Sequence, residues 1–165
     1  EEVILLGLGT IAVMVEVFLL PGFGVAGVLG ILFVAAATVL TPHDGEYEAL
    51  TGSPPDADRF GAVRRLASAT GAVVLLKGPT TVVGGPGGHV WASRTGDARL
   101  ATAGTGDVLT GLLVALLAQG VGPEEGAAAA AFLHGRAGAL AWRRGLVAGD
   151  VVDHLPHALA ELPGG

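Results

Sequence analysis

Two glycines and an aspartate stand close together in the run Leu100-Ala-Thr-Ala-Gly-Thr-Gly-Asp-Val-Leu-Thr-Gly111. Gly104 and Gly106 free the backbone to turn its N–H groups inward, and the helix expected to follow adds the positive end of its dipole. Together these features suit a phosphate or a developing oxyanion. We therefore place the working centre at residues 101–107, with an anion hole formed by Gly104, Thr105 and Gly106.

Asp107 ends this turn, and a carboxylate is an unexpected neighbour for an anion unless it has to accept a proton. The run of residues therefore indicates a catalytic role for Asp107. The alternative is that Asp107 is the N-cap of the following helix, where its carboxylate would accept hydrogen bonds from the first free N–H groups.

A lysine follows an apolar segment in Leu75-Leu-Lys-Gly-Pro-Thr-Thr-Val-Val83. A lysine at the exit of a buried strand can reach a phosphate as a point charge. Thr80 and Thr81 add hydroxyls and backbone donors beside it. Lys77 is the only lysine of a chain that otherwise uses arginine, which favours a function over the alternative of a solvated strand end.

A third group of polar residues is Thr41-Pro-His-Asp-Gly-Glu46. His43 follows the end of an expected strand, which is where α/β proteins place ligand contacts. Asp44 and Glu46 could bind a hydrated cation. The alternatives are a turn histidine without function and two acids at a helix start, where they complement the helix dipole.

Other histidines and arginines give weaker signals. His154 and His157 have i,i+3 spacing but no third ligand, so we expect no metal site there. His134 lies in a glycine-containing helix and is expected to be packed. We expect a solvated helix face from three arginines, Arg136, Arg143 and Arg144.

Strands and helices alternate along the chain, which predicts an α/β layered fold. The expected strands are the end of a strand at Ala37–Thr41, a buried strand at Ala72–Leu76, and a hairpin that joins Val82-Val83 to Val90-Trp91. The expected helices are a short helix that ends near Thr51-Gly52, an amphipathic helix over Asp56–Thr70 stopped by Gly71, and later helices over Val108–Gln119, from Gly122 to about Trp142, and over Gly149–Leu162. The amphipathic helix is expected to bury Phe60, Val63, Leu66 and Ala67.

Composition limits the classes of function. A chain of 165 residues suffices for one domain with a modest core. It has no cysteine, which excludes disulfides and thiol chemistry. The formal net charge is −6 and there is no basic cluster, which argues against a nucleic-acid partner.

The first forty residues differ from the rest, because Glu1, Glu2 and Glu16 are their only charged groups. The apolar runs Val3–Leu20 and Val25–Leu40 flank a Pro-Gly turn, which predicts a helical hairpin in or on a membrane. A buried αα-hairpin is the alternative. We therefore divide the chain into an apolar hairpin, 1–40, and an α/β domain, 41–165. The run Glu16-Val-Phe-Leu-Leu-Pro-Gly-Phe-Gly-Val-Ala-Gly-Val-Leu-Gly30 resembles the membrane segment of NfeD-like proteins, over residues 3–40.

The remaining motifs, together with Phe132-Leu-His-Gly-Arg-Ala-Gly138, resemble the ADP/ATP-dependent NAD(P)H-hydrate dehydratases over about residues 37–163. That family belongs to the ribokinase-like superfamily, so the resemblance implies the C-terminal portion of a ribokinase-like layered fold. It implies the repair of hydrated NADH or NADPH in the cytoplasm, with ADP or ATP as co-substrate and Mg²⁺ beside the nucleotide.

The resemblance also implies roles for single residues. Asp107 would be the base near the substrate hydroxyl, and the amides between Gly104 and Gly106 would hold the transferred phosphate. His43 would contact the hydrated dinucleotide. The nucleotide would be held by Lys77, Gly78, Pro79, Thr80, Thr81 and Gly106. A homo-oligomer is compatible with the family.

The chain departs from the family before Thr41. In that family several βα units precede the Thr-Pro-His segment, whereas here an NfeD-like segment takes their place, with the join near Ala35–Val39. We therefore expect the activity of this chain alone to be impaired. Two other functions stay open, a membrane-anchored scaffold or interaction protein and a different ribokinase-like small-molecule kinase. The His43 turn favours the dehydratase over the kinase.

Overall fold

The computed structural model describes residues 39–162. The chain divides into two compact units, residues 1–40 and 41–165. The predicted hairpin, its NfeD-like resemblance and its membrane contact fall on residues 1–40 and so lie outside the described part, apart from the short strand β1 (Val39–Leu40). No helix among residues 39–162 is long and apolar enough to span a bilayer.

A small sheet with the strand order β1-β2-β3-β4 is the centre of the fold. The strands β2 (Val73–Leu76), β3 (Thr81–Gly84) and β4 (Val90–Ser93) pair antiparallel, with Leu75 opposite Val83 and Val83 opposite Trp91. The predicted buried strand and the predicted hairpin are both confirmed. All four residues of β2 are buried, and each such aliphatic side chain contributes about 1.5–3 kcal/mol.

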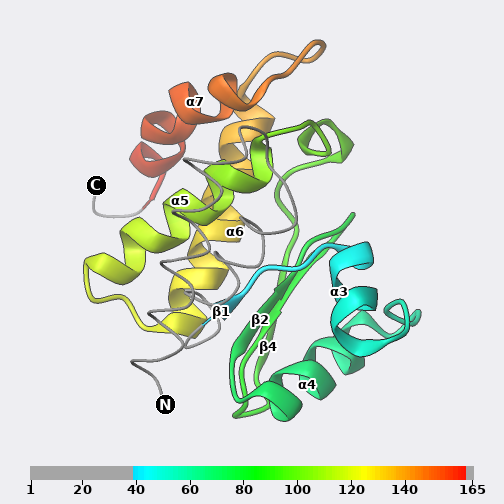
Figure 1. Ribbon diagram of the computed structural model, residues 1–165. Coiled ribbons are helices and arrows are strands. Elements are labelled where there is room, and N and C mark those ends of the chain that lie inside the picture. The colour runs from blue at the N-terminus through cyan, green and yellow to red at the C-terminus, as the bar shows by residue number, and fades with distance from the viewer. Residues whose placement is uncertain (1–38, 163–165) are drawn as a thin grey trace, which may run out of the picture. The chain divides into compact units, whose positions relative to one another are not determined.

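The helix α4 (Arg59–Thr70) packs on one face of this sheet, and α3 (Asp44–Thr51) lies on the same side of it (Figure 1). The helix α4 starts three residues later than predicted because Asp58 is its N-cap, accepting a hydrogen bond of 3.0 Å from the Gly61 N–H. As predicted, α4 stops at Gly71, which is in the left-handed conformation. Tyr47 of α3 donates its hydroxyl to the Ala62 carbonyl of α4 and so joins the two helices.

The prediction that Phe60 is buried is wrong, since 43% of its surface is exposed. The buried stripe of α4 consists of Ala62 together with the predicted Val63, Leu66 and Ala67. With 3.6 residues per turn, Phe60 lies on the flank of this stripe. Its place at the edge of the buried stripe leaves the aromatic ring half in solvent.

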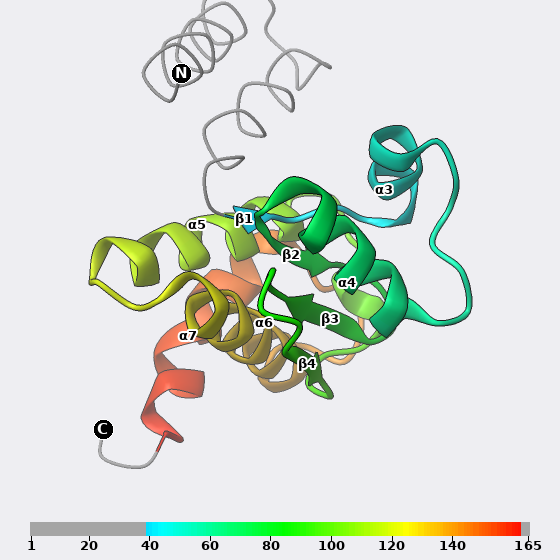
Figure 2. The ribbon, with the colours of Figure 1, turned by 90° about the horizontal axis from the view of Figure 1, so that it is seen from below.

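Three helices lie on the other side of the sheet, α5 (Thr105–Ala118), α6 (Pro123–Leu140) and α7 (Ala148–Ala160) (Figures 1 and 2). The helix α6 contacts β2, β3 and β4, and both α5 and α7 pack against α6. Their core is a buried cluster formed by Leu133, Ala137, Ala141, Leu146, Val151 and Ala158. The described chain is therefore a layered α/β domain, as predicted.

Candidate active site

The first turn of α5 is built around Gly104, the N-cap of this helix, which has a φ of +86°. This is the left-handed region, which glycine enters without the Cβ penalty of other residues. Among residues 39–162, neither the Gly104 N–H nor the Gly106 N–H has a hydrogen-bond acceptor. These two amides, at the positive end of the α5 dipole, can bind an anion.

Asp107 occupies the third position of α5 and is exposed. The N-cap of α5 is Gly104, so Asp107 does not have the alternative role of capping the helix. Its backbone N–H donates to the Gly104 carbonyl at 3.2 Å, and its carboxylate has no hydrogen-bond or ionic partner within the described chain. A carboxylate in this position can accept a proton beside an anion held by the glycines.

Lys77 follows β2 and reaches the same helix end. A Cβ built on Gly106 would lie 3.8 Å from the Lys77 Nζ, so the ammonium group lies beside the first turn of α5. The Lys77 Nζ is 3.2 Å from Oε2 of Glu46, and about a quarter of the Lys77 side chain is exposed. Lys77 and the Gly106 amide, 29 residues apart in sequence, can thus act on one anion.

His43 is the N-cap of α3 and belongs to the same network. Its Nδ1 accepts the N–H groups of Gly45 and Glu46 at 3.1 and 3.2 Å, and Oε2 of Glu46 accepts the His43 N–H at 2.7 Å. This reciprocal pair is a capping box. Because Nδ1 is an acceptor here, it carries no proton in this arrangement.

The two acids of the Thr41–Glu46 segment are both occupied by basic groups. Asp44 pairs with Arg59 at 2.8 Å, and Glu46 pairs with Lys77. The hypothesis that they bind a hydrated cation is therefore not favoured. The structure favours the alternative, in which the two acids lie at the start of a helix and complement its dipole. Within residues 39–162 there is no cluster of three or more histidine, aspartate and glutamate side chains able to hold a metal ion.

Arg59 supports the Lys77 turn and was not identified from the sequence. Its guanidinium donates to the Lys77 carbonyl at 2.7 Å, and its Nε is buried without a partner in the described chain. A Cβ on Gly78 would lie 2.5 Å from this guanidinium. A side chain at position 78 would thus displace the guanidinium of Arg59. The contact of Arg59 with Lys77 joins residues 18 positions apart, and nothing local in the sequence signals it.

Thr105 plays a different part from the one predicted for the anion hole. Its side chain is buried, and its hydroxyl lies 2.6 Å from the Leu100 carbonyl and 2.7 Å from the Thr102 carbonyl. Its N–H also donates to Thr102, at 3.3 Å. The donors of Thr105 hold the turn together, whereas the amides of Gly104 and Gly106 have no acceptor within residues 39–162.

His134 is buried, as predicted, and it contacts this turn from α6. Its Nε2 lies 2.9 Å from the Thr105 carbonyl. Since a carbonyl can only accept, Nε2 carries the proton. Burial lowers the pKa of His134 below its ordinary value of 6.5, although the hydrogen bond to Thr105 opposes this shift.

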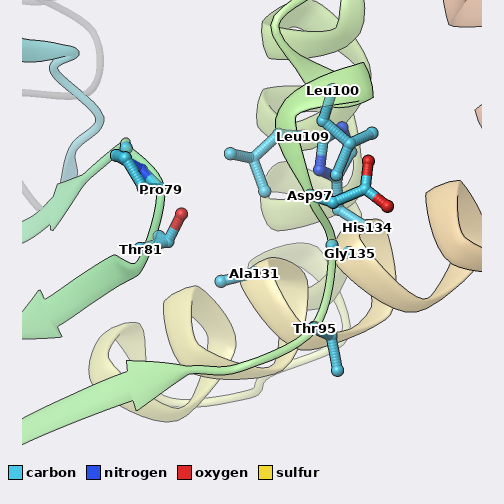
Figure 3. A pocket seen from close by; sticks show the side chains of 11 residues that line it. Pro79, Thr81, Thr95, Asp97, Leu100, Leu109, Ala131, His134 and Gly135 are labelled. Carbon is cyan, nitrogen blue, oxygen red and sulfur yellow. The ribbon is translucent and has the colours of Figure 1, made fainter.

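A cavity of about 50 Å³ lies between the Lys77 turn and α6. Figure 3 shows Pro79 and Thr81 on one side of it and Leu100, Leu109 and His134 on the other. Gly78 also lines the cavity, whereas Thr80 is exposed and does not. The predicted nucleotide segment therefore faces the helix that carries His134.

The weaker candidates lie elsewhere. The rings of His154 and His157 are 5.7 Å apart on α7, and His154 Nδ1 contacts the Asp150 carbonyl. Arg136 pairs with Glu161 at 2.8 Å, which raises the pKa of the arginine and lowers that of the glutamate. Two other arginines, Arg143 and Arg144, are exposed in the loop after α6 rather than on its face.

Comparison with known proteins agrees with this geometry. The family model described as NAD(P)H-hydrate dehydratase matches residues 33–160. The bifunctional NAD(P)H-hydrate repair enzyme Nnr of Mycobacterium leprae (strain TN) is 52% identical over 105 residues, which cover 64% of this chain and 22% of that relative.

Two solved structures share the fold. The ADP/ATP-dependent NAD(P)H-hydrate dehydratase from Bacillus subtilis, co-crystallised with ATP and Mg²⁺, matches with a TM-score of 0.70 and 33% identity over 74% of this chain and 47% of that chain. A ribokinase-like superfamily protein from Enterococcus faecalis matches with a TM-score of 0.63 and 23% identity over 80% of this chain and 50% of that chain. This chain therefore spans about half the length of these structures. The motifs, the ribokinase-like fold and the family match over residues 33–160 together show that the chain belongs to the NAD(P)H-hydrate dehydratase family.

Proposed function

We propose that this chain carries the phosphate-handling half of a site for the nucleotide-dependent dehydration of hydrated NADH or NADPH. The observation that carries the proposal is the position of the Lys77 ammonium beside Gly106, at the N-terminus of α5. A fixed ammonium and two free amides at one helix end suit the phosphoryl group of ADP or ATP. The choice of hydrated NADH or NADPH as the substrate rests on the family match and on the names of the relatives.

In the proposed reaction, Asp107 accepts the proton of the substrate hydroxyl while that oxygen bonds to the terminal phosphorus of the nucleotide. The bond from this phosphorus to its bridging oxygen breaks. In the second step the ring C–O bond breaks, phosphate leaves with the electron pair, and the neighbouring ring carbon loses a proton. The amides of Gly104 and Gly106 and the Lys77 ammonium stabilise the charge on the phosphoryl oxygens.

The described residues fit a Mg²⁺ ion that arrives with the nucleotide rather than one held by a protein cage. Magnesium is commonly bound by one or two carboxylates together with substrate phosphates. Asp107 offers one exposed carboxylate, and Asp44 and Glu46 are paired with cations. When bound, the ion would neutralise phosphate charge. The transfer of the hydroxyl proton would depend on Asp107, and the orientation of the phosphate would depend on Lys77 and the amides of Gly104 and Gly106.

His43 is proposed to contact the hydrated dinucleotide. Its imidazole Nε2 lies 3.5 Å from Oε1 of Glu46, and more than half of the side chain is exposed. Because Nδ1 is used as the cap of α3, the Nε2 edge is the one available to a substrate. The His43 contact and the dehydration itself distinguish this proposal from a ribokinase-like kinase that only phosphorylates an alcohol.

The test is a comparison of the full chain with its Asp107→Asn variant. Calorimetry measures ADP and ATP binding with Mg²⁺, and absorbance follows the recovery of NADH from its hydrate. We expect nucleotide binding to persist in the variant and turnover to fall by about 10²–10⁴-fold. Asp153→Asn, on the exposed surface of α7, is the matched control.

Two results would decide against parts of this proposal. Phosphate transfer to an alcohol without recovery of NADH would favour the kinase, and no nucleotide binding would favour the scaffold. Binding without turnover in the wild-type chain would agree with the expected impairment of a chain that spans half of its solved relatives.

Membrane contact through residues 3–40, a cytoplasmic location and a homo-oligomer are separate proposals. The first is supported only by the two apolar runs of the sequence. Sedimentation of the full chain with phospholipid vesicles tests it, and a protein that stays in the supernatant would contradict it. Light scattering measures the number of copies in solution.

A further inference from the structure

His134 and the turn before α5 meet although 29 positions separate the histidine from Thr105. The residue His134 is only 7% exposed, so its hydrogen bond to the Thr105 carbonyl does not compete with bulk water. Since a carbonyl oxygen can only accept, the proton of this hydrogen bond is on Nε2, and burial lowers the pKa of the ring. The contact is therefore a defined donor and acceptor pair between α6 and α5.

The Thr105 carbonyl and the Gly106 N–H belong to the same peptide group. A trans peptide is planar, and its C=O and N–H point in opposite directions. A donor that holds the carbonyl oxygen of Thr105 thus also sets the direction of the Gly106 N–H. That N–H has no acceptor in the described chain.

The backbone around His134 is itself held in place. A Cβ on Gly135 would lie 2.4 Å from Oγ1 of Thr95, and a Cβ on Gly138 would lie 2.6 Å from Cδ2 of Leu100. The two glycines let the segment that contains Thr95 and Leu100 approach α6 closely. The carbonyl oxygen of Leu100 in turn accepts a hydrogen bond from the Thr105 hydroxyl. The histidine therefore donates from a helix whose distance to the turn is fixed by packing.

We propose that His134 is a positioning residue, whose Nε2–H acts through the Thr105 carbonyl to aim the Gly106 N–H at the phosphate of the nucleotide. The role of the aimed amide rests on the proposed function. The hydrogen bond and its effect on the peptide group do not. Two separate measurements can therefore tell a failure of this inference from a failure of the proposed function.

The test compares His134→Gln with His134→Leu in the full chain. A glutamine amide can place an N–H donor close to the position of Nε2, whereas leucine fills the space without a donor. In ¹H–¹⁵N spectra we expect the Gly106 signal to move in the leucine variant and to return towards its wild-type position in the glutamine variant. With ADP and Mg²⁺, we expect the dissociation constant to rise about tenfold in the leucine variant and to recover in the glutamine variant.

His154→Leu is the matched control, because this histidine contacts the Asp150 carbonyl within α7. It should leave the Gly106 signal and the dissociation constant unchanged. An unmoved Gly106 signal in His134→Leu would overturn the inference, as would wild-type nucleotide affinity in that variant. If the wild-type chain binds no nucleotide while the Gly106 signal responds as expected, the proposed function fails and the positioning contact stands.

Discussion

The ammonium group of Lys77 is held 3.2 Å from Oε2 of Glu46, and the same oxygen accepts the backbone N–H of His43. One carboxylate thus joins the cap of α3 to the residue that follows β2. Because the ammonium also lies beside Gly106, this contact brings the three sequence motifs into one site. An incoming phosphate would find the lysine already ordered, which lowers the entropy lost on binding.

Replacing Lys77 by alanine should weaken nucleotide binding without unfolding the chain. Hydrogen bonds to charged groups contribute about 1.5–3 kcal/mol, so we expect the dissociation constant for ADP or ATP to rise at least tenfold in calorimetry. Arg65→Ala removes one positive charge from an exposed pair with Asp56 and is the control. An equal loss of affinity in both variants would mean that only the overall charge matters.

Replacing Gly104 by alanine should destabilise the fold. The φ of +86° costs an L-residue about 1–2 kcal/mol, and the new Cβ would lie 3.1 Å from Cβ of Ala148. Urea unfolding should therefore show a lower midpoint. Gly111→Ala, within α5 and open to space, should instead stabilise by about 0.5–1 kcal/mol. A Gly104→Ala variant as stable as the wild type would contradict the left-handed turn.

Replacing Thr105 by valine keeps the shape of the side chain and removes its hydroxyl. The carbonyls of Leu100 and Thr102 then lose a donor in a part-buried position. We expect a loss of about 1–3 kcal/mol in the free energy of unfolding. Thr105→Ser, which keeps the hydroxyl, should lose less. If serine and valine were equally harmful, packing of the methyl group would explain the effect instead.

The stability of the chain should depend on pH through His134. Its pKa is lowered in the folded state, mainly by burial, so the unfolded chain takes up this proton at a higher pH than the folded chain does. Above the ordinary pKa of 6.5, His134 does not make the free energy of unfolding depend on pH. Below that value, the free energy of unfolding decreases as the pH falls.

Urea unfolding at neutral pH and at about pH 5 measures this effect. His134→Gln cannot titrate and should lose less stability over this range than the wild type. His89→Gln, at an exposed position, should behave like the wild type. Equal losses in the wild type and in His134→Gln would show that other groups cause the pH dependence.

Much of the local structure could be predicted from the sequence. Gly71 ends a helix, the glycines between Val83 and Val90 make a hairpin, and the apolar segment before Lys77 is a buried strand. Each of these features depends on backbone conformation and on contacts within a few residues, which a short run of sequence specifies. The glycine-rich turn before α5 was predicted for the same reason.

What the sequence by itself determined is therefore the set of elements, the family to which the motifs belong, and the residues that gather at the start of α5. Only the tertiary structure decided that Arg59 lies under the Lys77 turn, that His134 donates to Thr105, and that Phe60 stays in solvent. The two hydrogen bonds join residues 18 and 29 positions apart, and the exposure of Phe60 depends on which stripe of α4 meets the sheet. Such contacts are set by the way the packed layers fix the distances between elements, and no local pattern of residue types encodes those distances.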